Sequence, residues 1–307
     1  MSQYEAAYNV PEAVADSLQQ QPREYKHFKV RPLSGALGAE ITDVSLSSLT
    51  ATAFQELRQA FSDHLVLTFP GQGLDMHQQV EFAGRFGPLM RYNFVQSVPG
   101  HDYVTEIRSA PGDKFNFGGV WHTDSMNFER PPKITLLQCR EAPAVGGDTS
   151  FANLYLAWET LSVGMQKLLR HMHAVAATSL SYGSSAEHGR EDFKQRTATP
   201  TQMEANEEND EFEHPVARTH PDTGRLALYL SRDYSAHFVG MTRSESLPLM
   251  RYLWEHASQP SLTCRVSWRP ETLTMWDNRC CKHYAHNDYP GNVRVMWRTI
   301  IEGESPC

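Results

Sequence analysis

Residues 273–301 read LTMWDNRCCKHYAHNDYPGNVRVMWRTII, a stretch that holds two strand-like runs and a turn. Leu273–Trp276 and Val293–Ile301 are rich in β-branched and aromatic residues, which favour strands with buried side chains. Pro290-Gly291 lies between them and is typical of a turn. With Leu262–Trp268 just upstream, these runs predict the core strands of a sheet.

Amphipathic segments accompany such runs along the rest of the chain. Thr52-Ala53-Phe54-Gln55 has the form of a capping box and predicts a helix to about His64, which Leu65–Phe69 follows as a buried strand. A second helix is predicted at Met76–Phe86. Thr242-Arg243-Ser244-Glu245 is another capping box, before a helix that we expect to end near Pro260.

The chain of 307 residues is long enough for one large domain with a single core, and it contains no repeat of fixed period. Residues 1–27 are polar, and we expect a flexible N-terminal arm there, followed by a single domain over residues 28–307. The segment 179–213 is polar and becomes acidic toward its end. It is interpreted either as a solvated loop or as a lid loop over an active site.

The composition argues against several classes of protein. A formal net charge of -8 gives no electrostatic footprint for nucleic acid, and no apolar run is long enough to span a membrane. The N-terminus lacks the basic start and apolar core of a secretory signal. Five cysteines without a C-x-x-C pair predict reduced thiols, so we expect a cytoplasmic protein.

Residues 118–124 read GGVWHTD and contain the first candidate metal ligands. In an extended segment, side chains two residues apart point to the same side, so His122 and Asp124 can reach one point in space. Their nitrogen and oxygen donors suit a borderline metal ion. Such pairs also occur as surface ion pairs or in turns, so the pair His122 and Asp124 alone does not establish a metal site.

His283 follows the predicted strand at Leu273–Trp276 and is the candidate third ligand. If folding brings it beside His122 and Asp124, the three form a facial triad of two imidazoles and one carboxylate. Such a triad leaves three coordination positions open, as an iron(II) oxygenase needs for a bidentate co-substrate and O₂. A zinc-dependent hydrolase, the alternative, needs only one open position.

Arg294 and Arg298 lie four residues apart in a predicted strand, so both side chains face the same side. Two inward-facing arginines in an apolar strand are costly unless each meets an anion. A dicarboxylate co-substrate would supply one. An Asp or Glu on a neighbouring strand is an equally good explanation.

Taken together, these motifs resemble the taurine dioxygenase (TauD/TfdA) family of iron(II)/2-oxoglutarate-dependent dioxygenases. The resemblance extends from Phe28 to Pro306 and includes the intervals from His122 to Thr149 and from His283 to both arginines. The matching motifs are Pro32–Ile41, Arg85-Phe86-Gly87, His122-x-Asp124, Gly146-Gly147-Asp148-Thr149, Trp276-Asp277-Asn278-Arg279, His283 and Arg294/Arg298.

The resemblance implies a mixed, mainly β fold, with a double-stranded β-helix (jelly roll, cupin-like) core flanked by α-helices. It implies that His122, Asp124 and His283 are the iron ligands and the catalytic residues. Thr149 and Arg294 would bind the distal carboxylate of 2-oxoglutarate, and Arg298 the anionic group of the substrate. Tyr92 and Phe94 are expected to line the substrate pocket.

The activity implied is hydroxylation of a small organic anion, a sulfonate or a carboxylate, with 2-oxoglutarate and O₂ as co-substrates and with release of succinate and CO₂. Hydroxylation at a carbon next to a heteroatom would cleave the product. The segment 88–95 lacks the histidine that the taurine enzymes carry there, so we expect an anion other than taurine.

An aryloxyalkanoate or alkylsulfate dioxygenase of the same fold is the nearest alternative. A zinc-dependent hydrolase is the alternative from another class, and a non-catalytic cupin-like binding protein ranks last because all three triad positions are present. The expected partners are a small anionic substrate and further copies of the chain, in a dimer or a tetramer, with neither nucleic acid nor a membrane.

Overall fold

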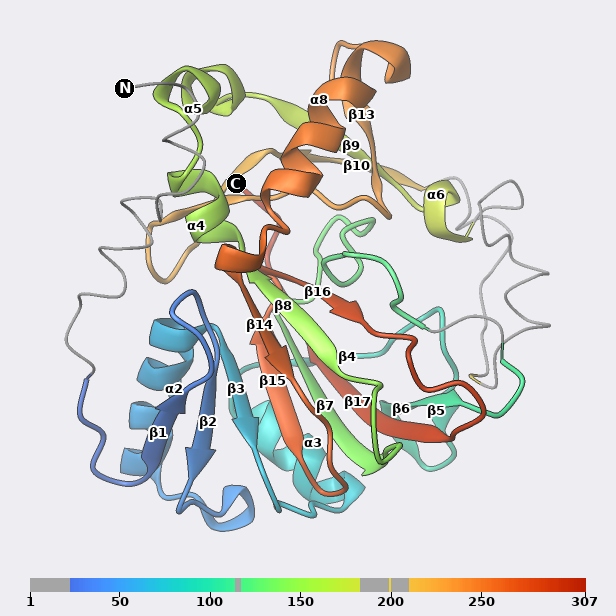
Figure 1. Ribbon diagram of the computed structural model, residues 1–307. Helices are drawn as coiled ribbons and strands as arrows, with labels where there is room; N and C mark the ends of the chain where they lie inside the picture. Colours follow the sequence, from blue (N-terminus) through green and yellow to red (C-terminus); the bar gives the residue numbers. More distant parts are fainter. Residues whose placement is uncertain (1–22, 114–116, 183–198, 200–209) are drawn as a thin grey trace.

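The computed structural model describes residues 23–113, 117–182, 199 and 210–307 (Figure 1). Residues 1–22 of the predicted arm and most of the segment 179–213 therefore lie outside the described residues. Residues 23–27 lie against helix α2 (Ala51–His64), because Tyr25 Oη donates a hydrogen bond to Asp63 and the backbone of Lys26 donates one to Glu56.

The described elements follow in chain order. The helices are α2 (Ala51–His64), α3 (Met76–Gly84), α4 (Leu154–Glu159), α5 (Val163–Leu169), α6 (Ser179–Tyr182) and α8 (Arg243–His256), with short 3-10 helices η2 (Leu46–Ser48) and η4 (Pro260–Leu262). The strands are β1 (Lys29–Pro32), β2 (Ala39–Thr42), β3 (Val66–Phe69), β4 (Leu89–Met90), β5 (Ser97–Val98), β6 (His101–Ser109), β7 (Ile134–Glu141), β8 (Thr149–Asn153), β9 (His173–Ala177), β10 (Glu211–Pro215), β11 (Ala217–Thr219), β12 (Leu226–Leu228), β13 (Ser235–Phe238), β14 (Thr263–Val266), β15 (Leu273–Asp277), β16 (Cys281–Ala285) and β17 (Arg294–Ile301).

Two sheets form the centre of the fold. The larger has nine strands in the order β1-β2-β3-β15-β7-β17-β6-β5, with β4 paired to β17, and only β2 and β3 are parallel. The smaller, β14-β8-β16, is antiparallel and lies across the middle of the larger one (Figure 1). Aromatic contacts join the two sheets, since the ring of Phe151 on β8 lies 5.3 Å from that of Trp276 on β15.

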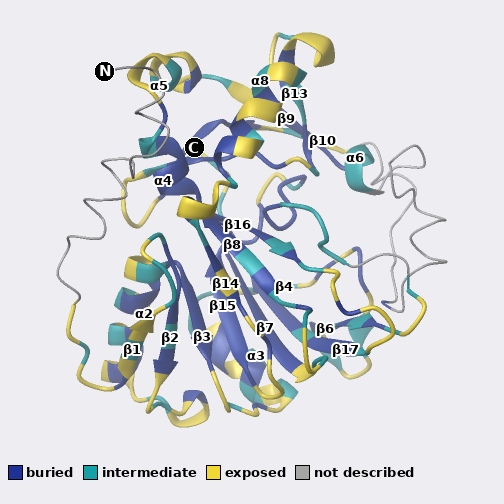
Figure 2. Ribbon diagram, viewed as in Figure 1, coloured by how far each residue is buried: buried dark blue, intermediate teal, exposed yellow. Residues whose placement is uncertain are grey.

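The larger sheet is apolar on both faces. Met275 packs in a core beneath helices α2 and α3, whereas its neighbour Trp276 packs in the core between the two sheets. This is the two-residue alternation of a strand, here with both faces buried. Figure 2 shows the central strands as buried and the exposed residues at the periphery. The arrangement agrees with the predicted mainly β core flanked by helices.

Several predicted boundaries are wrong by a few residues. Helix α2 begins at Ala51, because Thr50 and not Thr52 caps it by accepting a hydrogen bond from the backbone N–H of Ala53. Helix α3 ends at Gly84 and helix α8 ends at His256, before the predicted ends. The capping box at Thr242 and Glu245 is confirmed.

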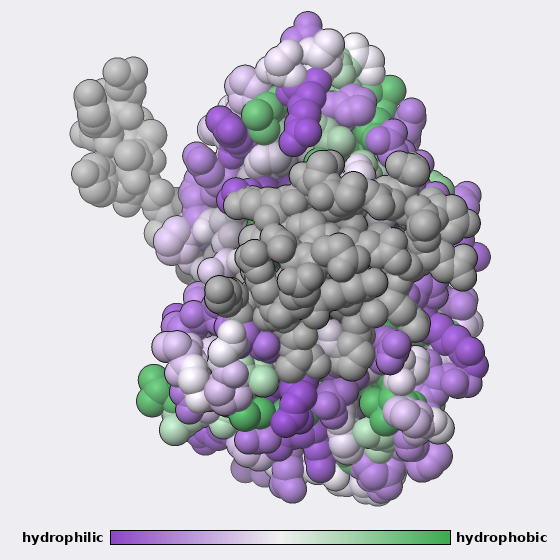
Figure 3. Space-filling view, turned by 90° about the vertical axis from the view of Figure 1, so that its right-hand side faces the viewer, coloured by the Kyte–Doolittle hydropathy of each residue, from purple (hydrophilic) through white to green (hydrophobic). Residues whose placement is uncertain are grey.

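The helices, the surface and the cysteines can be compared with what the composition predicted. No helix among the described residues has the length and apolar character that crossing a bilayer requires. On the face drawn in Figure 3, the described surface is mostly hydrophilic, with small, separate hydrophobic areas. None of the five cysteines forms a disulfide, and all but Cys307 are buried, so the prediction of free thiols is confirmed.

Replacing Thr50 with Ala tests the position of the α2 cap. Loss of the hydroxyl acceptor should lower the free energy of unfolding by about 1 kcal/mol, measured by urea denaturation. Thr52→Ala changes the residue that the sequence pattern favoured as the cap, also exposed, whose hydroxyl bonds only that of Thr50 among the described residues, and should change the free energy of unfolding by less than about 0.5 kcal/mol. If Thr52→Ala lowered the free energy of unfolding more than Thr50→Ala, Thr52 would be the cap, as the sequence predicted.

Candidate active site

A backbone bridge brings the two halves of the candidate triad together. The backbone N–H of His122 donates to the carbonyl of His283 at 3.0 Å, and that of His283 donates to the carbonyl of His122 at 2.8 Å. His283 lies on β16 of the smaller sheet, so the extended segment around His122 continues that sheet at its edge. The side chains of both histidines and of Asp124 converge as a result.

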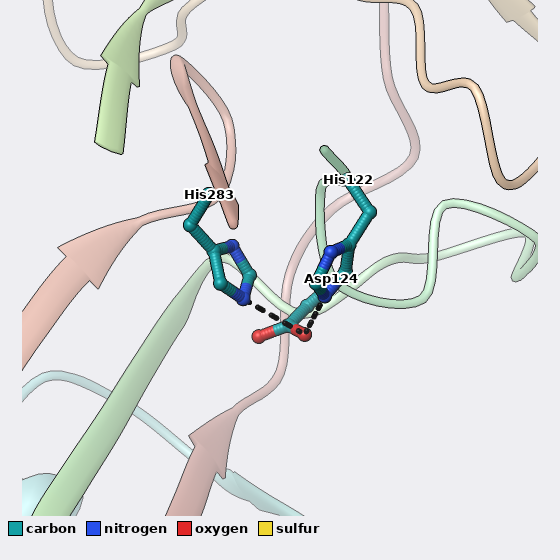
Figure 4. Close-up of side chains that lie close together, drawn as sticks. All are labelled: His122, Asp124 and His283. Atoms are coloured by element: carbon teal, nitrogen blue, oxygen red, sulfur yellow. Dashed lines mark ion pairs between the residues drawn. The ribbon is translucent and has the colours of Figure 1, made fainter. Parts of the chain in front are cut away.

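Nε2 of His122 and Nε2 of His283 each lie 3.8 Å from Oδ1 of Asp124. The two imidazole rings, 4.1 Å apart, point toward the same carboxylate oxygen (Figure 4). Two atoms bound to one ion at about 2.1 Å can be at most about 4.2 Å apart, so these distances suit a shared metal ion. All three side chains are buried.

Both imidazoles can offer a lone pair to a metal. Nδ1 of His122 lies 2.7 Å from the carbonyl oxygen of Val120, and donation of its proton to that oxygen leaves Nε2 unprotonated toward Asp124. Burial, together with the neighbouring His122 ring, lowers the pKa of His283 well below its ordinary value. His283 is therefore neutral, as a metal ligand must be.

The Asp124 carboxylate is held at both oxygens. Oδ2 accepts a hydrogen bond of 2.6 Å from the Thr135 hydroxyl, while Oδ1 lies 3.2 Å from Nη2 of Arg298. Burial alone would raise the pKa of Asp124, but Arg298, His283 and His122, together with the Thr135 hydrogen bond, lower it to about 2. Asp124 is ionised, and the acidic residue that Arg298 meets lies in a turn and not on a neighbouring strand.

Arg294 stands in a different environment from Arg298. Its guanidinium is buried, and Nε and Nη2 make no hydrogen bond to any residue that the structure describes. Burial lowers its pKa, which is the expected response of a cation removed from water. A buried guanidinium without an anion is costly, so this side chain fits an anionic ligand at the site.

Trp268 joins Arg294 to Thr149. Its indole N–H donates to the Thr149 hydroxyl at 3.0 Å, and the Arg294 guanidinium lies 5.7 Å from the centre of its ring. Thr149 and Arg294, which were predicted to act together, thus both lie beside Trp268. The sequence did not identify Trp268 as part of the site. A buried indole must find an acceptor, but the sequence does not say which one.

The two predicted pocket aromatics differ in their positions. The Arg298 guanidinium lies over the Tyr92 ring at 4.3 Å, so Tyr92 adjoins the site. Phe94 packs edge-on against Tyr92 at 5.6 Å and lies 5.4 Å from the Phe128 ring. Both predicted residues are buried, and Phe94 supports Tyr92 from behind.

A second buried cluster, His220, Asp277 and Cys280, also has three donor atoms close together. Arg279 donates to both oxygens of Asp277 at 2.9 and 2.7 Å, and Nε2 of His220 lies 3.1 Å from the same carboxylate. Burial alone would raise the pKa of Asp277, but Arg279 and His220 keep it far below its ordinary value. The carboxylate is already satisfied, so this cluster is an internal ion pair.

A mainly β core of two sheets that encloses two imidazoles and one carboxylate is typical of non-haem iron(II) oxygenases. A family model described as "Taurine catabolism dioxygenase TauD, TfdA family" matches residues 29–300. The chain belongs to this family, and the recognition made from the sequence is confirmed.

Three similar proteins are informative. An alkylsulfatase of Acinetobacter baylyi is 33% identical over 91% of this chain and 86% of its own. An alpha-ketoglutarate-dependent sulfate ester dioxygenase of Pseudomonas putida is 33% identical over 90% of each chain. The crystal structure of a taurine dioxygenase from Burkholderia xenovorans superposes with a TM-score of 0.76, at 30% identity, over 92% of this chain and 93% of that one.

These similarities confirm the predicted double-stranded β-helix and the predicted enzyme class. The chain is an oxidoreductase of the iron(II)- and 2-oxoglutarate-dependent type, with O₂ as the second co-substrate. The zinc-dependent hydrolase and the non-catalytic binding protein lose their support.

Gly146 begins the loop that leads to Thr149, and its replacement tests how tightly that loop is packed. Gly146 has φ +86°, and an added Cβ would lie 2.7 Å from the carbonyl oxygen of Asp288. Gly291, with φ +77° and open space around it, is the matched control. Gly291→Ala should cost about 1 kcal/mol of unfolding free energy from backbone strain, and Gly146→Ala at least about 1 kcal/mol more. Equal losses in urea denaturation would contradict the packing described.

Proposed function

We propose that this dioxygenase hydroxylates a small organic anion with an apolar body, foremost a sulfate ester, at the carbon next to the ester oxygen. The observation that carries the proposal is the pair of buried arginines on β17, one beside Asp124 and the other without a protein anion among the described residues. Two relatives at 33% identity, named for alkyl sulfate and sulfate ester chemistry, support the substrate class.

His122, Asp124 and His283 are the proposed iron ligands. Their donors, two imidazoles and one ionised carboxylate, are those of iron(II) oxygenases, and the two 3.8 Å separations fit one ion. When bound, iron(II) and 2-oxoglutarate together activate O₂ for hydroxylation, with release of succinate and CO₂. The protein supplies the ligands, binds both organic molecules and keeps water away.

Arg294 and Thr149 are the proposed site for the distal carboxylate of 2-oxoglutarate. The free Nε and Nη2 of Arg294 form the edge of a guanidinium that carboxylates bind with two hydrogen bonds. Thr149 accepts from the Trp268 indole, so the proton of its hydroxyl remains to donate to the same carboxylate. A dicarboxylate bound here satisfies the buried charge of Arg294.

Arg298 is the proposed anchor for the anionic group of the substrate. Its guanidinium already lies 3.2 Å from a triad oxygen, so an anion bound to it holds the adjoining carbon near the metal position. The Tyr92 ring beneath the guanidinium gives the substrate an apolar wall. Phe94 and Phe128 extend this aromatic wall behind Tyr92.

Hydroxylation beside the ester oxygen leads to cleavage. A carbon that carries both a hydroxyl and a sulfate ester loses the sulfate as the hydroxyl proton leaves and its oxygen becomes a carbonyl. The products are an aldehyde and hydrogen sulfate. A sulfonate would release sulfite in the same way, and an aryloxyalkanoate would release a phenol.

The substrate class is tested with the purified enzyme, iron(II), 2-oxoglutarate and three candidates: hexyl sulfate, taurine and 2,4-dichlorophenoxyacetate. We expect sulfate release from hexyl sulfate in equal amount to succinate, at a kcat/KM at least tenfold above the others. Sulfite or phenol as the main product would reject the sulfate ester. Turnover with zinc and without 2-oxoglutarate would reject the oxygenase itself.

Arg294→Met tests the 2-oxoglutarate site. Loss of a charge-assisted, two-point hydrogen bond of about 1.5–3 kcal/mol should raise the KM for 2-oxoglutarate roughly 10- to 100-fold, with the KM for the organic substrate nearly unchanged. Arg140→Met, which removes an exposed arginine stacked on Trp297, is the matched control and should leave both KM values unchanged. Equal increases for both substrates would reject the assignment.

The single domain over residues 28–307, the lid loop at 179–213, the cytoplasmic location and the dimer or tetramer remain predictions.

A further inference from the structure

The motif Trp276-Asp277-Asn278-Arg279 carries two side chains to which the proposed reaction gives no task. Trp276 and Asn278 are buried at the end of β15, and Asn278 is fully buried. A fully buried amide in an apolar core is costly unless all its polar atoms are paired. Where its hydrogen bonds lead therefore shows what the motif does.

The hydrogen bonds form a chain that ends on the candidate triad. The Trp276 indole N–H donates to Oδ1 of Asn278 at 2.9 Å, and Nδ2 of Asn278 donates to the Thr135 hydroxyl at 2.9 Å. The Thr135 hydroxyl donates to Oδ2 of Asp124 at 2.6 Å. Thr135 lies on β7, next to β15 in the larger sheet, and is fully buried.

The Trp276 indole determines which group donates and which accepts in every bond of this hydrogen-bond chain. An indole N–H can only donate, so the Asn278 atom that faces it must be the carbonyl oxygen. The amide nitrogen then faces Thr135 and can only donate to it. Because the Thr135 oxygen accepts that bond, its single proton is directed to Asp124.

We propose that Trp276, Asn278 and Thr135 form a one-way hydrogen-bond chain that positions the Asp124 carboxylate for metal binding. The inference rests on the proposed role of Asp124 as an iron ligand. The chain occupies Oδ2, so the ion would bind at Oδ1, the oxygen nearest both imidazoles and the one that Arg298 also approaches. Groups that hold a metal ligand in this way typically change metal affinity 10- to 100-fold.

The first test is equilibrium binding of Co²⁺ to the metal-free full-length protein, measured by calorimetry. Thr135→Val keeps the shape of the side chain but removes the hydroxyl, and we expect the Kd to rise about 10- to 100-fold. Thr135→Ser restores the donor and should bring the Kd back to within about threefold of the original.

Thr274→Val is the matched control for Thr135→Val. Thr274 is also fully buried in the larger sheet, and its hydroxyl donates to the Thr68 hydroxyl at 3.0 Å, away from the triad. Both variants should lower the Tm, Thr135→Val by more, because it loses two buried hydrogen bonds and Thr274→Val loses one. Only Thr135→Val should weaken Co²⁺ binding.

The second test asks whether Asn278 acts through Thr135. Asn278→Ala should raise the Co²⁺ Kd several-fold, because the Thr135 proton is no longer directed to Asp124. In the double variant Thr135→Val/Asn278→Ala, the Kd should equal that of Thr135→Val alone, because Thr135→Val already removes the hydrogen bond to Asp124 that Asn278 directs. Additive losses would reject the chain.

Failure of the proposed function can be recognised separately. If Asp124→Ala binds Co²⁺ like the original protein, Asp124 is not a ligand and the proposed function falls with the inference. If Asp124→Ala loses binding while Thr135→Val remains folded and keeps the original Kd, the positioning chain alone is rejected. Failure of Thr135→Ser to recover the affinity would also reject it.

Discussion

The backbone bridge between His122 and His283 is the constraint on which the site depends. Two backbone hydrogen bonds, at 3.0 and 2.8 Å, fix segments that are far apart in the chain as neighbours at the edge of the smaller sheet. The side chain of Asp124, two residues further on, then reaches the same point. Because backbone hydrogen bonds in a buried sheet resist displacement, this bridge fixes the two histidines relative to each other.

Charge compensation is the second organising feature of the interior. The ionised Asp124 meets Arg298 and the Thr135 hydroxyl, and the ionised Asp277 meets Arg279 and His220. Each buried carboxylate is paired, as the cost of desolvation requires. Arg294 departs from this pattern among the described residues, and for that reason we propose that it binds an anionic ligand.

Much of the fold and of the site was predictable from the sequence, for identifiable reasons. Strand runs such as Val293–Ile301 are long and apolar, and the two-residue spacing of His122 and Asp124 and the four-residue spacing of Arg294 and Arg298 are local properties. The helix cap at Thr50 was missed because Thr52 also fits the capping pattern, and only the backbone geometry selects between them. Trp268 and Thr135 were missed because folding, and no regular spacing in the sequence, brings their partners Thr149 and Asp124 beside them.

The contact between Arg298 and Asp124 has a consequence for the order of events in the proposed enzyme. Oδ1 of Asp124 is both the oxygen nearest the two imidazoles and the one that Arg298 approaches. A cation bound there competes with the guanidinium for one oxygen and weakens their attraction, which makes the arginine more available to an incoming anion. By thermodynamic linkage, loading of the metal and affinity for the organic substrate should then favour each other.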